Sequence, residues 1–418
     1  MSMASKTPMP SAEAAKDAVD REAGRGEFFG PLRRRWAQLS RQQQWAWMLV
    51  IVAAAYALPL LNPPLISTEP GTNFALACAE MARFALVAVG LNIVVGYAGL
   101  LDLGYVAFFA VGAYVAAMLT SPDSPYIKIP YLWTLPVAIA VTMCAGVILG
   151  VPTLRLRGDY LAIVTLGFGE IIRILATIIP AAKGQVGFQN VGAPPGLLGD
   201  GTPIFSNSNG VPWYWLILTV LIIIMLLAGN LERSRVGRAW VAIREDEDAA
   251  EAMGVPTFKY KVWSFALGAG VGGLSGALFA GQIGFVNNQR FDVQTSILFL
   301  AAVVIGGTGN KVGAVIGGAL VAYLPLRFVE IANYKFFIFG VLLVVIMIFR
   351  SKGLLGARQH LLTYARQAYG KVAAAARKGG VLPPHRSDTG IIPAVGTSGR
   401  GRAGGATAAP TTKKGDRA

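Results

Sequence analysis

The sequence predicts an all-α polytopic membrane protein with about ten transmembrane helices and with both termini in the cytoplasm. Three observations lead to this fold class. Only 14% of the 418 residues are charged, against about 25% in soluble domains, and 54% are hydrophobic. Apolar runs recur from residue 45 to residue 350, and arginines gather in alternate connections between them.

Residues 1–44 are polar and include Arg33, Arg34, Arg35 and Arg41 close to the first apolar run. That run begins too late for a cleavable signal peptide, and no small-residue cleavage site follows it. We interpret it as a signal anchor that leaves a cytoplasmic N-terminal segment, 1–44.

The transmembrane domain is expected over residues 45–350. A spanning helix needs about 20 apolar residues, and most of the runs are close to that length. The run at 293–309 ends in a glycine-rich stretch and could instead be re-entrant or broken. The predicted runs are 45–61, 76–97, 103–120, 131–152, 160–180, 212–229, 260–284, 293–309, 312–331 and 334–350.

Basic residues set the predicted orientation. Ten spans that start inside place 153–159, the loop 230–259 and the residues after 350 in the cytoplasm, and these segments are rich in arginine. The loop 181–211 would then be periplasmic, and it contains one basic residue, Lys183. The charge bias and the even number of spans therefore agree.

The tail, 351–418, holds twelve Lys or Arg residues against two Asp. No aromatic residues interleave the far tail as nucleic-acid stacking would need, so we expect contact with anionic membrane lipid and no nucleic-acid partner. Residues 380–418 cannot form a core and are predicted to be disordered, whereas 354–378 could lie on the membrane as a basic amphipathic segment.

The sequence lacks the residues for a catalytic or metal site within the apolar runs. Both histidines, His360 and His385, lie in the tail, and the two cysteines, Cys78 and Cys144, lie within apolar runs. The glycine-rich stretch 306–311 lacks the spacing of a phosphate-binding loop and a Ser or Thr after its lysine. We therefore expect a chain that is not an enzyme and binds no ATP or other cofactor.

The loop 230–259 contains a predicted charged helix at 239–253, which Gly254 and Pro256 would end. Ala249 and Ala250 are small residues on an otherwise charged helix, and they would permit close approach to another protein. The segment could equally be a solvated connector.

The run 260–284 carries small residues at every fourth position, which form one ridge on a helix. A subunit interface, a sliding helix and ordinary internal packing all fit this ridge. Its residues are Gly268, Gly272, Gly276, Ala280 and Gly284, and Gly313 and Gly317 repeat the spacing in a later run.

Charged residues inside apolar runs are costly and by default indicate function. Glu170 and Arg173 are spaced to pair on one face of a helix, and Glu80 and Arg83 repeat that spacing. Each pair could neutralise itself or line a path for a zwitterion. Asn92 and Gln282 are weaker candidates for the same path, and Asp102 and Asp159 are placed to cap helices.

The segment Leu154–Arg173, the motifs within 88–114 and the stretch from Val303 to Ala319 together resemble the LivM-type permeases of branched-chain amino acid ABC importers. The resemblance covers about residues 80–356. It implies a multi-pass protein of the bacterial inner membrane that works with a second, LivH-type permease. It also implies two ATPase subunits, which bind ATP-Mg, and a periplasmic substrate-binding protein.

The resemblance also implies that the charged loop helix is the ATPase-coupling helix, because the stretch from Asp248 to Gly254 is similar to the importer signature. The residues assigned to coupling are Arg244, Glu245, Asp248, Ala249, Ala250 and Gly254.

Two loops depart from the family pattern, at 184–190 and 287–291, and both are expected to face the binding protein. Related permeases carry urea or short amides on the same scaffold, so the substrate has an alternative. An ion-coupled secondary carrier would also explain the intramembrane charges, although no convincing internal repeat supports it.

Overall fold

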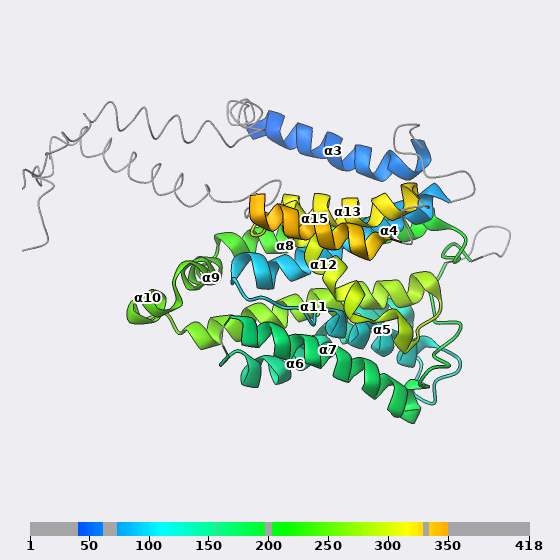
Figure 1. The fold of residues 1–418 in the computed structure, drawn as a ribbon. Coiled ribbons are helices and arrows are strands. Elements are labelled where there is room, and N and C mark those ends of the chain that lie inside the picture. Colours follow the sequence, from blue (N-terminus) through cyan, green and yellow to red (C-terminus); the bar gives the residue numbers. More distant parts are fainter. Residues whose placement is uncertain (1–40, 62–72, 157, 197–202, 329–333, 350–418) are drawn as a thin grey trace, which may run out of the picture. The chain divides into compact units, whose positions relative to one another are not determined.

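The computed structural model describes residues 41–61, 73–156, 158–196, 203–328 and 334–349. The tail 351–418 and nearly all of the segment 1–44 lie outside the described residues, so the predictions for those parts stay predictions. Within the described ranges every named element is helical, and an isolated antiparallel bridge pairs Phe188 with Val286 (Figure 1).

A helix lies in each of the ten predicted apolar runs. The elements, in chain order, are α3 (Arg41–Leu61), α4 (Phe74–Leu91), η1 (Asn92–Tyr97), α5 (Val106–Thr120), α6 (Tyr131–Thr153), α7 (Asp159–Ile178), η2 (Pro180–Ala182), α8 (Gly210–Arg233), α9 (Arg235–Glu245), α10 (Glu247–Ala252), α11 (Thr257–Ile283), η3 (Asn288–Arg290), α12 (Val293–Gly306), α13 (Lys311–Arg327) and α15 (Lys335–Phe349).

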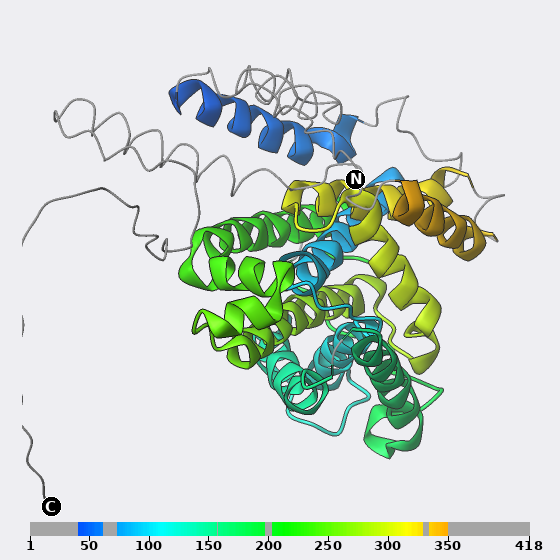
Figure 2. The same cartoon turned by 60° about the vertical axis from the view of Figure 1, so that its left-hand side comes forward.

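Five helical stretches in the described part are long and apolar enough to cross a membrane: α4 with η1, α6, most of α7, α8 and α11. The buried share of each stretch shows which helices lie at the centre of the bundle and which lie at its outside. In α11 83% of the apolar stretch is buried, and in α4 with η1 78%, against 28–33% for the other three. Helices α5 and α6 pack against α11, and α8 and α13 pack against α4 (Figures 1 and 2). Much of the apolar surface of α6, α7 and α8 therefore faces outward.

The small residues of α11 bring its backbone against α4, η1 and α5. A Cβ at Gly268 would meet the side chain of Val94, and one at Gly276 would overlap the carbonyl of Phe109. The ridge therefore packs within this chain over these positions. Gly284, in contrast, follows the end of α11 as its C-cap, with φ +71°, and lies beside Asn207.

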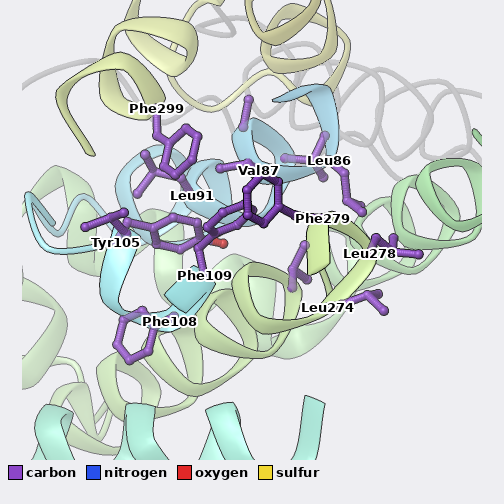
Figure 3. Close-up of a cluster of buried hydrophobic side chains, with 14 of the residues drawn as sticks. Leu86, Val87, Leu91, Tyr105, Phe108, Phe109, Leu274, Leu278, Phe279 and Phe299 are labelled. Atoms are coloured by element: carbon purple, nitrogen blue, oxygen red, sulfur yellow. The ribbon is translucent and has the colours of Figure 1, made fainter. Parts of the chain in front are cut away.

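Aromatic side chains fill the space between α4, α5, α11 and α12 (Figure 3). The ring of Phe109 lies at the centre of this cluster, 5.3 Å from Phe279 and 5.4 Å from Phe299 between ring centroids. Such edge and tilted contacts add about 0.5–1.5 kcal/mol each beyond the apolar area that they bury. The cluster packs α4 against α11, and these two helices carry Arg83 and Gln282, which are described below.

The chain between η1 and α5 is not helical, although much of it is buried. A buried irregular segment needs side-chain partners for its backbone groups. Asp102 Oδ1 accepts from Gly104 N at 2.9 Å, Thr165 Oγ1 accepts from Leu103 N, and Ser296 Oγ donates to Leu103 O. Polar side chains from α7 and α12 thereby hold the break in place.

The predicted ambiguity over 293–309 concerns α12, which has 14 residues and ends at Gly306. At about 1.5 Å per residue it is shorter than the roughly 30 Å hydrocarbon core. Gly307, with φ +107°, turns the chain out of the helix, and Asn310 caps the start of α13. Helix α12 alone is therefore too short to cross a bilayer.

Candidate functional site

The loop between α8 and α11 forms two helices, so the prediction of one continuous helix at 239–253 is wrong. Asp246 has an extended backbone, with φ −159° and ψ 111°, between α9 and α10. Its Oδ1 accepts from Ala249 N at 2.9 Å and caps α10, as an aspartate at this position commonly does. The break turns α10 away from the direction of α9 (Figure 1).

Helix α9 is anchored to the rest of the chain by Trp240. Its indole is fully buried, and Nε1 donates to the carbonyl of Tyr260 at 2.7 Å. Helix α10 is fastened by an ion pair of 2.5 Å between Glu247 and Lys261, whose side chain is almost completely buried in α11. A movement of α10 is therefore coupled to α9 and to α11.

The two predicted alanines of α10 face different ways. Ala249 is exposed, whereas Ala250 is buried against the chain itself. Met253 follows the helix with 85% of its surface exposed, and Gly254 turns the chain with φ +83° in open space. An exposed alanine beside an exposed methionine forms a small apolar surface that another protein can approach closely.

Arg244, in the last turn of α9, reaches η1 and the loop before α13. Its Nη1 donates to the carbonyl oxygen of Gly96, and its Nη2 lies 3.5 Å from Thr308 Oγ1. Asn92, at the start of η1, accepts from Gly309 N through Oδ1 at 2.8 Å. This group of contacts, which we call the Arg244 junction, joins α9, η1 and residues 307–310.

A second polar group lies toward the other ends of α4 and α11. Arg83 is buried, and its Nη1 donates to Gln282 Oε1 at 2.7 Å. Its Nη2 lies 3.3 Å from Glu80 Oε1, and its guanidinium lies 4.9 Å from the ring centroid of Phe279. The arrangement places a cation, a carboxylate and an amide beside the aromatic cluster.

Glu170 and Arg173 form a bidentate ion pair on α7, and each side chain is about one-third exposed. One turn further on, Thr177 Oγ1 accepts from Asn288 Nδ2 at 2.6 Å, which ties α7 to η3.

The four predicted pathway residues do not form one cluster. Gln282 joins Arg83, Glu170 and Arg173 pair with each other on α7, and Asn92 belongs to the Arg244 junction. The spacing of Glu80 and Arg83 predicted their pairing. The link between Arg83 and Gln282, 199 residues apart, has no signal in the local sequence pattern.

Comparison with known proteins identifies the family. The model of the branched-chain amino acid transport system permease component matches residues 76–348. The chain belongs to this permease family. The match begins after α3 and includes α10, the Arg244 junction, the Arg83–Gln282 contact and the Glu170–Arg173 pair. The candidate sites therefore lie within the matched part.

Individual relatives agree with the family. The chain is 36% identical over 310 residues to the high-affinity branched-chain amino acid permease protein LivM of Salmonella typhimurium, which covers 69% of this chain and 72% of the relative. It is 37% identical over 291 residues to LivM of Escherichia coli K12, and the match covers 65% of this chain and 67% of the relative. The autoinducer 2 import permease LsrC of Salmonella typhi is 27% identical over 235 residues, and the match covers 53% of this chain and 64% of the relative. No solved structure matches.

A permease component works by moving a solute, and the described residues contain no group of three or more His, Cys, Asp or Glu side chains placed to hold a metal ion. Several charged side chains in the described part form ion pairs, including Glu80 with Arg83 and Glu232 with Lys311 at 3.2 Å.

The Glu80→Gln variant of this permease is expected to lower the free energy of unfolding by about 1–3 kcal/mol. The change leaves the buried Arg83 charge without its carboxylate, which costs about 3–5 kcal/mol in a fully buried pair and less here because Glu80 is partly exposed. Thermal unfolding in detergent measures the effect.

The control for this prediction is Glu170→Gln, whose partner Arg173 is itself one-third exposed, so that a smaller loss is expected. The double variant Glu80→Gln with Arg83→Met removes both charges and is expected to recover part of the lost stability. Equal losses for the two single variants would contradict the importance of Arg83 burial.

Proposed function

We propose that this chain is a permease subunit of an ATP-driven importer that moves branched-chain amino acids across the bacterial inner membrane. The observation that carries the proposal is the 36–37% identity to two permeases named for branched-chain amino acid transport, over at least two-thirds of their length. Leucine, isoleucine and valine are the proposed substrates.

The proposed topology has ten spans over 45–350, cytoplasmic termini, a cytoplasmic loop at 230–259 and a periplasmic loop at 181–211. The arginines of the first loop and the near absence of basic residues from the second support this orientation. The short helices α5 and α12 would be completed by the irregular segments beside them, which side chains of the same chain satisfy.

The proposed partners are a LivH-type second permease, two ATPase subunits that bind ATP-Mg, and a periplasmic substrate-binding protein. The exposed surface of α10 around Ala249 and Met253 supports docking of an ATPase subunit. We assign the coupling role to Arg244, Glu245, Asp248, Ala249, Ala250 and Gly254. This chain itself is proposed to bind no cofactor.

The proposed substrate path passes the Arg83–Gln282 contact and the Glu170–Arg173 pair. Arg83 with Glu80, and Arg173 with Glu170, offer a guanidinium for a carboxylate and a carboxylate for an ammonium group, which are the two charges of an amino acid. The neighbouring aromatic cluster suits an apolar side chain. Asn92 is better explained by its bond to Gly309 than by contact with substrate.

Uptake of labelled leucine in cells with this chain deleted tests the function. Deletion is expected to abolish high-affinity leucine uptake, and the intact chain is expected to restore it. Labelled urea is the parallel probe for the alternative substrate class. Loss of urea uptake with unchanged leucine uptake would retain the importer architecture and overturn the substrate.

Deletion cells that carry the restored chain also distinguish an ATP-driven importer from an ion-coupled carrier. An ATP-driven importer keeps working when an uncoupler collapses the ion gradients and ATP is maintained, whereas an ion-coupled carrier stops. Continued leucine uptake under uncoupler is the expected result.

A further inference from the structure

The Arg244 junction is a direct physical link between the α9–α10 segment and the most buried part of the bundle. Arg244 lies two residues before Asp246, the residue that caps α10. Its guanidinium contacts the carbonyl of Gly96 in η1 and Thr308 in the loop before α13. Few residues therefore separate the exposed surface of α10 from the end of α4.

The element that receives Arg244 is a π-helix, a wide turn that often occurs at functional sites. Carbonyl groups at the end of a helix lack partners within it. The guanidinium donates to one of them, that of Gly96, in a charge-assisted hydrogen bond. Asn92 at the other end of η1 is bonded to Gly309, so both ends of the π-helix are held from outside it.

The backbone beside Arg244 is shaped to let its side chain pass. Gly99 has φ +72°, and a Cβ there would lie 2.8 Å from Arg244 Cγ and 3.3 Å from its Cα. A Cβ at Gly96 would overlap the side chain of Asn92 and lie 2.5 Å from the nitrogen of Gly309. Glycine is thus required at both positions for the three segments to approach this closely.

We propose that Arg244 is a positioning residue that transmits movement of α10 to η1 and to residues 307–310, and through η1 to α4. Helix α4 carries Glu80 and Arg83, so the same rigid element connects the Arg244 junction with the contact to Gln282. This inference rests on the proposed function and adds to it the residue that couples the ATPase surface to the substrate path.

The test uses the complete importer, with its second permease, ATPase subunits and binding protein, reconstituted in lipid vesicles. ATP hydrolysis stimulated by loaded binding protein and leucine uptake are measured together for wild type and Arg244→Gln. The expected result is hydrolysis within about twofold of wild type with uptake per ATP reduced about tenfold, a typical size for the coupling between two sites. Arg244→Lys keeps the charge and is expected to recover part of the ratio.

The matched control is Arg238→Gln on the same helix. Among the contacts that the structure describes, the Arg238 side chain bonds only to the nearby carbonyl of Arg233, at 3.1 Å, so the ratio should not change. Gly99→Ala is the second variant, because its methyl group obstructs the Arg244 side chain without removing the charge. It is expected to reproduce the loss of uptake per ATP.

An unchanged ratio of uptake to hydrolysis in Arg244→Gln would overturn the inference, whether both rates stay at their wild-type values or fall by the same factor. An equal fall of both rates would mean that Arg244 acts in docking rather than in transmission. If Arg244→Gln does not assemble, the ratio in Gly99→Ala decides in the same way. Failure of the proposed substrate appears instead in the wild-type complex, as hydrolysis without leucine uptake.

Discussion

Replacing Ala249 by tryptophan is expected to abolish leucine uptake and to release the ATPase subunits while the permease itself stays folded. Ala249 is exposed on α10, so a large side chain fits in the isolated chain and obstructs only a docked partner. A loss of about 2 kcal/mol at such a contact weakens binding about 30-fold. Co-purification of the ATPase subunits and leucine uptake measure the result.

Two further substitutions sharpen this prediction. Ala250→Trp puts the same bulk at the buried neighbour and is expected to disturb the permease before any partner binds. Ala140→Trp places it on the exposed face of α6, far along the chain from α10, and is expected to leave assembly intact. If Ala249→Trp retained its ATPase subunits and its uptake, docking on α10 would have to be abandoned.

The difference between the two alanines illustrates what local sequence can predict. The composition of 239–253 predicted a helical, charged segment with a glycine stop, and α9, α10 and Gly254 follow that outline. It did not predict the break at Asp246, because Asp246 and Asp248 are both suitable caps and the sequence does not distinguish them. Without the position of the cap, the inward and outward faces of α10 cannot be assigned.

Hydropathy predicted where helices occur, since each apolar run has few other ways to satisfy its backbone groups. It did not predict where those helices are interrupted. The run 76–97 is apolar on both sides of Asn92, yet the chain widens into η1 at that residue, where the Asn92 side chain bonds to Gly309 more than 200 residues away. The interruption depends on a tertiary contact, and a contact of this kind leaves no periodic signal in one sequence.

The same reason limits prediction of the polar groups. Spacing of three residues predicted the pairs Glu80–Arg83 and Glu170–Arg173, and both are present. The choice of Gln282 as the partner of Arg83 depends on how α4 packs against α11. That packing depends in turn on glycines. The sequence shows where these glycines are, but it does not show which residues of other helices face them.

The second large effect is expected from Gly112→Ala in α5. A Cβ at this position would overlap the backbone of Gly273 in α11, and neither backbone can move without separating the two helices. Overpacking a close contact costs about 1–3 kcal/mol, and the cost is expected at or above the upper end here because the obstacle is main chain rather than a flexible side chain. The yield of folded permease and its thermal unfolding in detergent measure the loss.

Gly167→Ala in α7 is the matched control, because it makes the same change in the interior of a helix with no atom within 4 Å of the new Cβ. There the better helix propensity of alanine, up to about 1 kcal/mol, is unopposed, so a neutral or slightly stabilising effect is expected. Similar behaviour of the two variants would mean that α5 and α11 do not approach as closely as the structure places them. A selective loss in Gly112→Ala would instead establish the central packing on which α4, η1 and the Arg244 junction depend.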